Sequence, residues 1–277
     1  VELHKAFLSL RNTTAGKLKR ADYGLKVADR LWGRTGFPIR ESFRDLTRTY
    51  YSAEMQPVDF SQPAAAAEMI NSWVTNQTNG KNRNFISPTD LNPELTRLVL
   101  TNAIYFKGRW KEQFLTVNTR REPFFIDEET IVVQMMSQTK MFRFTDDDEK
   151  QILDLPYHRN GLSMILILPK QKTREALTRL ESVLNAKNLE DWLSQMKEQK
   201  VDLSLPKFHF ESKFRVSETL KAMGIKQAFD SELAYLTGIT FGRPFWLQWV
   251  LHEAYVDVDE LGTEAAAATG GGAFGGG

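Results

Sequence analysis

Apolar and polar residues repeat along this chain with two different periods, which separate predicted helices from predicted strands. Apolar residues three or four positions apart, such as Leu3, Phe7 and Leu10, are typical of an amphipathic helix. By this criterion we expect helices over residues 3–12, 42–51, 64–77, 173–184, 189–196 and 216–223.

Strict alternation and short continuous apolar runs predict strands in the remaining ordered segments. We expect strands over residues 23–33, 98–106, 124–133, 135–144, 151–156, 162–168, 201–210 and 245–258. The run over 98–106 is apolar on both faces apart from Thr101 and Asn102, which is typical of a central strand covered on both sides. Because helices and strands follow no strict βαβ alternation, the fold class is α+β. The chain has no internal repeat and no proline- or serine-rich linker, so we expect one domain over residues 1–277.

Composition excludes several classes of protein. The 277 residues are 42% hydrophobic and 26% charged, as in a globular protein. The formal net charge of +1 gives no global field that would recruit nucleic acid or an anionic membrane, and the chain has no cysteine. No apolar run approaches the roughly 18 residues of a membrane span, and no signal peptide is visible. Since the chain does not start with methionine, we expect it to begin inside a longer precursor.

A search for catalytic chemistry finds no supported site. The four histidines lack zinc-ligand spacing, and neither a Gly-x-Ser-x-Gly elbow nor a phosphate-binding loop occurs. The glycine-rich stretch 270–275 matches a dinucleotide fingerprint but would have to open a helix, so we reject it. We therefore expect no enzyme, no metal and no cofactor. The basic residues Lys5, Arg11, Lys17, Lys19 and Arg20 suit a weak polyanion site or, as we favour, an ordinary solvated face.

The segment over residues 263–269 is unusual because its side chains are small with one exception. As a strand, it would place Thr263, Ala265, Ala267 and Thr269 on one face and Glu264, Ala266 and Ala268 on the other. Such a strand can enter between two existing strands, because small groups meet little resistance and the only charge stays on the other face, where we expect substitution to cost little. An alanine helix capped by Thr263 is the alternative, and composition alone favours it.

Residues 262–269 resemble the hinge of the reactive-centre loop in the serpins, a family of serine protease inhibitors. Further segments resemble serpin signatures in the expected order, at residues 70–81, 100–110, 203–208, 220–229 and 252–260. The resemblance implies the serpin fold, with a large central mixed β-sheet, smaller sheets and an exposed reactive-centre loop over residues 260–277. It also implies further helices and a strand before residue 3 and a core hairpin after the loop, which this sequence does not contain.

The resemblance further implies a suicide mechanism, in which a serine protease cleaves the loop and the hinge then inserts into the central sheet. The implied hinge residues are Glu260, Gly262, Thr263, Glu264, Ala265, Ala266, Ala267, Ala268 and Thr269. The implied reactive bond joins Gly276 to Gly277, which would suit a protease that accepts small residues before the cut.

Four residues match positions that control sheet opening in the family. Asn102 and His252 match a hydrogen-bonded pair across the opening, Lys207 matches the partner of Glu260, and Trp110 matches the tryptophan at the upper end of the sheet. The alternative function is a non-inhibitory serpin acting as a carrier or chaperone, since glycines 270–272 would weaken an inserted strand. We expect secretion, with the cytoplasm as the alternative compartment.

Overall fold

The structure, a computed structural model of the 277-residue chain, describes residues 2–19, 24–127, 129–158, 161–241 and 245–275. Its helices are α1 (Glu2–Lys19), α2 (Glu41–Tyr51), α3 (Pro63–Gln77), α4 (Arg174–Val183), α5 (Ala186–Gln195) and α6 (Ser217–Ala222), with short 3₁₀ helices at Pro88–Asp90, Thr116–Asn118 and Gln227–Phe229. Its strands are β1 (Gly24–Arg34), β2 (Glu54–Val58), β3 (Thr96–Arg109), β4 (Arg120–Ile126), β5 (Glu129–Asp146), β6 (Lys150–Pro156), β7 (Ser163–Pro169), β8 (Lys197–Pro206), β9 (Phe208–Arg215), β10 (Phe245–Val258) and β11 (Gly262–Gly275).

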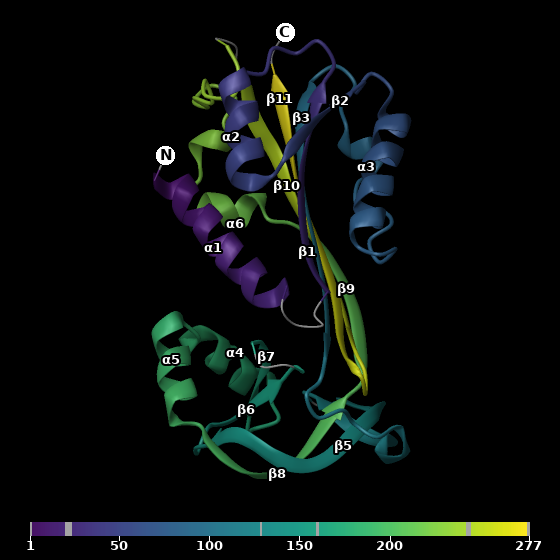
Figure 1. The fold of residues 1–277 in the computed structure, drawn as a ribbon, viewed down its shortest axis with the longest axis vertical. Helices are drawn as coiled ribbons and strands as arrows, with labels where there is room; N and C mark the ends of the chain where they lie inside the picture. Colours follow the sequence, from purple (N-terminus) through teal and green to yellow (C-terminus); the bar gives the residue numbers. More distant parts are fainter. Residues whose placement is uncertain (1, 20–23, 128, 159–160, 242–244, 276–277) are drawn as a thin grey trace.

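A long six-stranded sheet forms the centre of the molecule, in the order β2-β1-β3-β11-β10-β9. It is mixed, because β1 and β2 pair in parallel while its other pairs are antiparallel. Figure 1 shows α3 on one side of this sheet and α1, α2 and α6 on the other. The α+β class and the central position of the strand around residues 98–106 are confirmed.

Helix α3 packs on the sheet through one apolar stripe. Its buried residues Ala66, Ala67, Ile70 and Val74 recur at helical spacing, and Pro63 stands at the first helical position, where its missing N–H costs nothing. The stripe belongs to a core cluster that also contains Trp249 of β10. This packing fixes α3 and the segment that follows it over the middle of the sheet.

The last described segment of the chain is a strand, which corrects two expectations. Residues 262–275 were expected to be an exposed loop, with an alanine helix as the alternative for 263–269. Instead they form β11, paired antiparallel to β3 on one edge and to β10 on the other. The reason is that β3 and β10 offer two facing edges, so an inserted strand satisfies its backbone N–H and C=O groups on both sides.

A second sheet lies at the lower end of Figure 1, with the order β4-β5-β6-β7 and with β8 paired to β5. The single strands expected over 124–133 and 201–210 are each two strands. The first breaks at Asp127, which has a φ of 55°, and the second at Lys207. Strands β8 and β9 therefore belong to different sheets, and Lys207 stands where the chain passes from one to the other.

Candidate functional site

A tight turn over residues 259–262 joins β10 to β11. The Asp259 carboxylate accepts hydrogen bonds from the backbone N–H of Leu261 (2.8 Å) and of Gly262 (3.1 Å). A Cβ on Gly262 would lie 1.9 Å from the carbonyl oxygen of Gly108. Only a glycine fits where β11 enters the sheet. Asp259 was missed by the sequence analysis, although an Asp three residues before a glycine is a recognised turn signal.

Trp110 holds this turn from the side. Its buried indole donates a hydrogen bond from Nε1 to the carbonyl oxygen of Asp259 (2.9 Å), and its backbone N–H donates to the carbonyl of Leu261 (2.9 Å). The indole stacks on Tyr157, with ring centroids 4.7 Å apart and planes 11° apart. The tryptophan therefore contacts the point at which the hinge begins.

The Glu260 carboxylate is nearly buried and accepts two side-chain hydrogen bonds. Lys207 Nζ lies 2.7 Å from its Oε2, and the Thr119 hydroxyl donates to its Oε1 over 2.8 Å. Burial opposes ionisation of Glu260, but the hydrogen bonds from Lys207 and Thr119 outweigh it and hold its pKa below the ordinary value. The structure thus brings Lys207 and Glu260 together. The expected role of this pair in sheet opening stays a prediction.

Thr263 points into the core, as the strand pattern predicts for its face. Only 5% of the residue is exposed, and its Oγ1 accepts a hydrogen bond from the Tyr157 hydroxyl at 2.9 Å. Tyr157 therefore contacts both Trp110 and the first inward residue of the hinge. Nothing in the sequence pattern singles out this tyrosine.

Glu264 lies on the opposite face, but it is not free in solvent, which corrects the expectation that substitution there would cost little. Its carboxylate accepts a hydrogen bond of 2.6 Å from Tyr105 and lies 3.5 Å from Lys81 Nζ and 4.0 Å from Lys107 Nζ. Lys81 belongs to the segment after α3, which covers this face of the sheet. Alternation along a strand predicts on which face a side chain lies, but it does not predict which other segment of the chain covers that face.

Asn102 and His252 stand on either side of β11, each paired in register with Thr269. In this arrangement Asn102 Nδ2 donates to Asp29 Oδ1 on β1 over 2.6 Å. Burial raises the pKa of Asp29, and the hydrogen bond from Asn102 and the charge of Arg11 only partly offset it. Because β11 lies between their two strands, the expected hydrogen bond between Asn102 and His252 stays a prediction for a sheet without β11.

Gly272 is buried where the indole of Trp249 crosses β11. A Cβ at this position would lie 2.6 Å from the indole ring, so glycine is required for the ring to pack there. The glycine-rich stretch therefore weakens the strand but also makes room for the Trp249 indole at Gly272. The expected reactive bond, Gly276–Gly277, lies outside the described residues.

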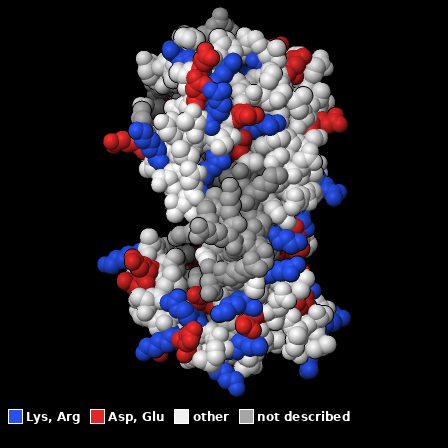
Figure 2. Space-filling model, in the orientation of Figure 1, with Lys and Arg blue, Asp and Glu red and all other residues white. Residues whose placement is uncertain are grey.

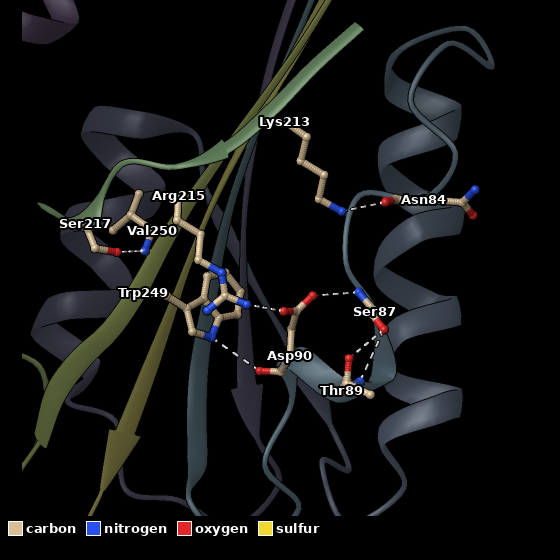
Figure 3. A network of polar contacts seen from close by, with 9 residues as sticks. All are labelled: Asn84, Ser87, Thr89, Asp90, Lys213, Arg215, Ser217, Trp249 and Val250. Atoms are coloured by element: carbon tan, nitrogen blue, oxygen red, sulfur yellow. Dashed lines mark hydrogen bonds and ion pairs between the residues drawn. The ribbon is translucent and has the colours of Figure 1, made fainter. Parts of the chain in front are cut away.

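The segment after α3, residues 78–91, is fastened to the far edge of the sheet (Figure 3). Arg215 of β9 lies 2.6 Å from the Asp90 carboxylate, whose other oxygen accepts from the backbone N–H of Ser87. Lys213 donates to the carbonyl of Asn84, and Trp249 donates from Nε1 to the carbonyl of Asp90. This connection, which we call the α3 strap, is thus held at β9 and β10.

Of the basic residues expected to cluster near the N-terminus, Lys5 and Arg11 are the two whose side chains the structure describes. Arg11 forms an ion pair with Asp29 and donates to the carbonyl of Tyr51, whereas Arg20 lies outside the described residues. On the face shown in Figure 2, basic and acidic side chains are intermixed. In the described ranges, no group of residues could hold a metal ion, and no helix combines the length and apolar character needed to cross a membrane.

Comparison with known proteins gives one consistent result. The family model described as serpin (serine protease inhibitor) matches residues 1–275. Neuroserpin of Gallus gallus is 39% identical over 261 residues, and leukocyte elastase inhibitor of Bos taurus is 38% identical over 278 residues. These alignments cover 91% and 98% of this chain, respectively, and 63% and 73% of the two relatives. The chain therefore spans less than two thirds of the neuroserpin.

Solved structures agree with this match. The structure of cleaved Serpin 42Da superposes with a TM-score of 0.90 and 32% identity, covering 99% of this chain and 72% of that one. A loop-inserted, cleaved ovalbumin mutant gives a TM-score of 0.86 and 34% identity, covering 91% and 67%.

Proposed function

Because this chain belongs to the serpin family, we propose that it inhibits a serine protease as a suicide substrate. The protease's serine oxygen bonds to the carbonyl carbon of the reactive bond, the bond to the next nitrogen breaks, and that nitrogen leaves as an amine with the serine's proton. Residues 262–275 then enter the sheet as β11 and carry the attached protease away. The Gly276–Gly277 bond is our candidate for the cut. Serpins generally inhibit proteases and are not enzymes themselves.

The observation that supports this proposal best is the position of β11. It is antiparallel to both neighbours, Thr263 is buried against Tyr157, and Gly262 and Gly272 have no room for a side chain. The chain is therefore well suited to hold its hinge inside the sheet. Asn102, Trp110, Lys207 and His252 surround the path of insertion, and we assign them to control of sheet opening.

The test replaces Thr263 with arginine in the full-length protein that contains this chain. Thr263→Arg must bury an unpaired guanidinium against Tyr157, at a cost of several kcal/mol, so insertion slows while cleavage continues. We expect cleaved product to replace the covalent complex on denaturing gels. Leu261→Arg is the matched control, since that side chain is 58% exposed and its contacts to Trp110 are made by the backbone.

Equal trapping by the Thr263→Arg variant and its parent would overturn the insertion mechanism. Failure of the parent to trap any protease, together with stable binding of a small apolar ligand or a client protein, would favour the carrier or chaperone function. Secretion of this protein stays a prediction. Detecting the protein outside or inside the cells of the organism that produces it would test that prediction.

A further inference from the structure

Four alanines in succession give β11 little information about its register. Residues 265–268 are identical, and residues 270–272 are all glycine, so a slip by two residues would keep the same faces and nearly the same side chains. Yet each residue from 263 to 274 has one partner on β3 and one on β10 in this structure. Something outside the repeated segment must fix the pairing.

The two residues before the alanines differ from them in kind and are held on opposite faces. Thr263 accepts a hydrogen bond from Tyr157 on the core face, and Glu264 accepts one from Tyr105 on the face beneath the α3 strap. A shift of two residues in either direction would remove Thr263 and Glu264 from the two tyrosines, and in one direction it would put alanine in their places. Both contacts are therefore specific to one register.

The residues around Glu264 form a binding site suited to a carboxylate. Tyr105 is 6% exposed and donates to Oε1, while Lys81 and Lys107 lie 3.5 and 4.0 Å from Oε2. Lys81 is in turn placed by Tyr255 of β10, to whose hydroxyl it donates over 3.3 Å and whose ring centroid lies 4.9 Å from its Nζ.

The charge balance of this cluster favours an ionised Glu264. Burial opposes ionisation, but the hydrogen bond from Tyr105 and the charges of Lys81 and Lys107 outweigh it and lower the pKa of Glu264. The other carboxylate at the cluster, Asp257, accepts from the Tyr255 hydroxyl at 3.3 Å. With β11 in place, the Glu264 carboxylate lies within 4.0 Å of both lysines.

We propose that Glu264 is a positioning residue, which sets the register of the inserted strand by docking its carboxylate in the site formed by Tyr105, Lys81 and Lys107. The inference rests on the proposed function, because it concerns how the hinge enters the sheet. It also links β11 to the α3 strap, since Lys81 belongs to the strap and lies over the strand.

A disulfide trap reports the register directly, because this chain has no cysteine of its own. Val256 of β10 pairs with Ala265 of β11. Directly opposed antiparallel residues have Cα atoms about 4.5–5.5 Å apart, within the range of a disulfide. In the full-length protein carrying Val256→Cys and Ala265→Cys, cleavage by the target protease under oxidising conditions should close this disulfide.

Adding Glu264→Ala should lower the disulfide yield and raise the number of inhibitor molecules consumed per protease by about tenfold, with an unchanged rate of cleavage. Glu54→Ala is the matched control, because it removes the same charge from an exposed position on the edge strand β2. As a second measurement, a synthetic peptide of residues 262–275 should anneal to the uncleaved protein faster than the same peptide carrying Glu264→Ala. This comparison does not depend on folding of the variant.

The outcomes separate the two proposals. If the parent traps protease and closes the disulfide, and Glu264→Ala does both equally well, the role of Glu264 is wrong and the inhibitory function stands. If the parent neither traps protease nor closes the disulfide, the proposed function fails, and the register proposal fails with it.

Discussion

At the scale of single residues, Gly262 has less room for a side chain than Gly272, the other glycine of β11 whose surroundings the structure describes. An added Cβ would lie 1.9 Å from the Gly108 carbonyl oxygen and 2.8 Å from the Cα of Arg109. Both are backbone atoms of β3, which cannot move without breaking the pairing of Gly262 with Arg109. The requirement for glycine here is one of space.

We predict that Gly262→Ala destabilises the cleaved, inserted protein by at least about 1–3 kcal/mol, the range found for overpacked cores. Thermal denaturation after cleavage measures the effect. Gly238→Ala is the control, because no atom lies within 4 Å of a Cβ there and the backbone is not left-handed. Similar melting of the two variants would show that β3 can yield at this point.

At the scale of elements, the pair formed by Lys207 and Glu260 connects two junctions between strands. Lys207 stands between β8 and β9, and Glu260 stands between β10 and β11. Because β8 belongs to the smaller sheet, the pair helps hold the two sheets together. The Glu260 pKa is lowered, so its contribution is present above the ordinary carboxyl pKa and is lost as the pH falls below the folded value.

We therefore predict that Lys207→Met lowers the denaturation midpoint clearly at about pH 7, and that this effect fades as the pH falls through the lowered pKa of Glu260 and its carboxylate becomes protonated. The comparison is Lys221→Met. That lysine is equally exposed, but its partner Glu218 is largely in solvent, so its loss should have little effect at any pH in this range. A pH-independent effect of Lys207→Met would assign its role to the side-chain stem.

Most elements could be predicted from the sequence, because their periodicity is local. The break at Asp127 was missed although polar residues over 127–130 interrupt the apolar run, and it is a tight turn across which Ile126 pairs with Glu129. The break at Lys207 could not be predicted, since alternation continues across it and only the pairing of β8 with β5 and of β9 with β10 decides where each strand ends. Strand β2 was missed because its five residues gain their order from parallel pairing with β1. Helix α1 runs on past Asn12 to Lys19 and includes Gly16, which the apolar spacing does not predict.

The candidate site likewise has features that the sequence predicts and features that it does not. Alternation predicted that Thr263 lies on the inward face. It did not predict the carboxylate site around Glu264, because Lys81 comes from a segment far away in sequence. The expected loop is a strand because β3 and β10 each offer it an edge for pairing. These edges are a property of the folded sheet and cannot be read from residues 262–275.

At the scale of the whole molecule, the smaller sheet exposes apolar side chains. Phe125, Val132 and Leu168 are 47%, 59% and 60% exposed and lie on three different strands. Scattered apolar residues are ordinary on a surface, but several on one sheet favour association.

We predict that residues 1–277 expressed alone self-associate and melt without a single cooperative transition. Analytical ultracentrifugation and circular dichroism give the two readouts. Phe125→Lys with Val132→Lys should reduce the association, whereas Leu233→Lys with Tyr235→Lys, at exposed apolar positions outside the strands, should not. A monomer with one sharp transition would contradict this prediction.

The place of β11 also determines which way its neighbours run. Because β11 is antiparallel to β3 and to β10, those two strands run in the same direction. A sheet that closed without β11 would have to pair them in parallel, an arrangement slightly less stable per residue than the antiparallel one. Under the proposed mechanism, entry of β11 would exchange one parallel interface for two antiparallel ones, and this gain in strand pairing would favour insertion whatever the side chains contribute.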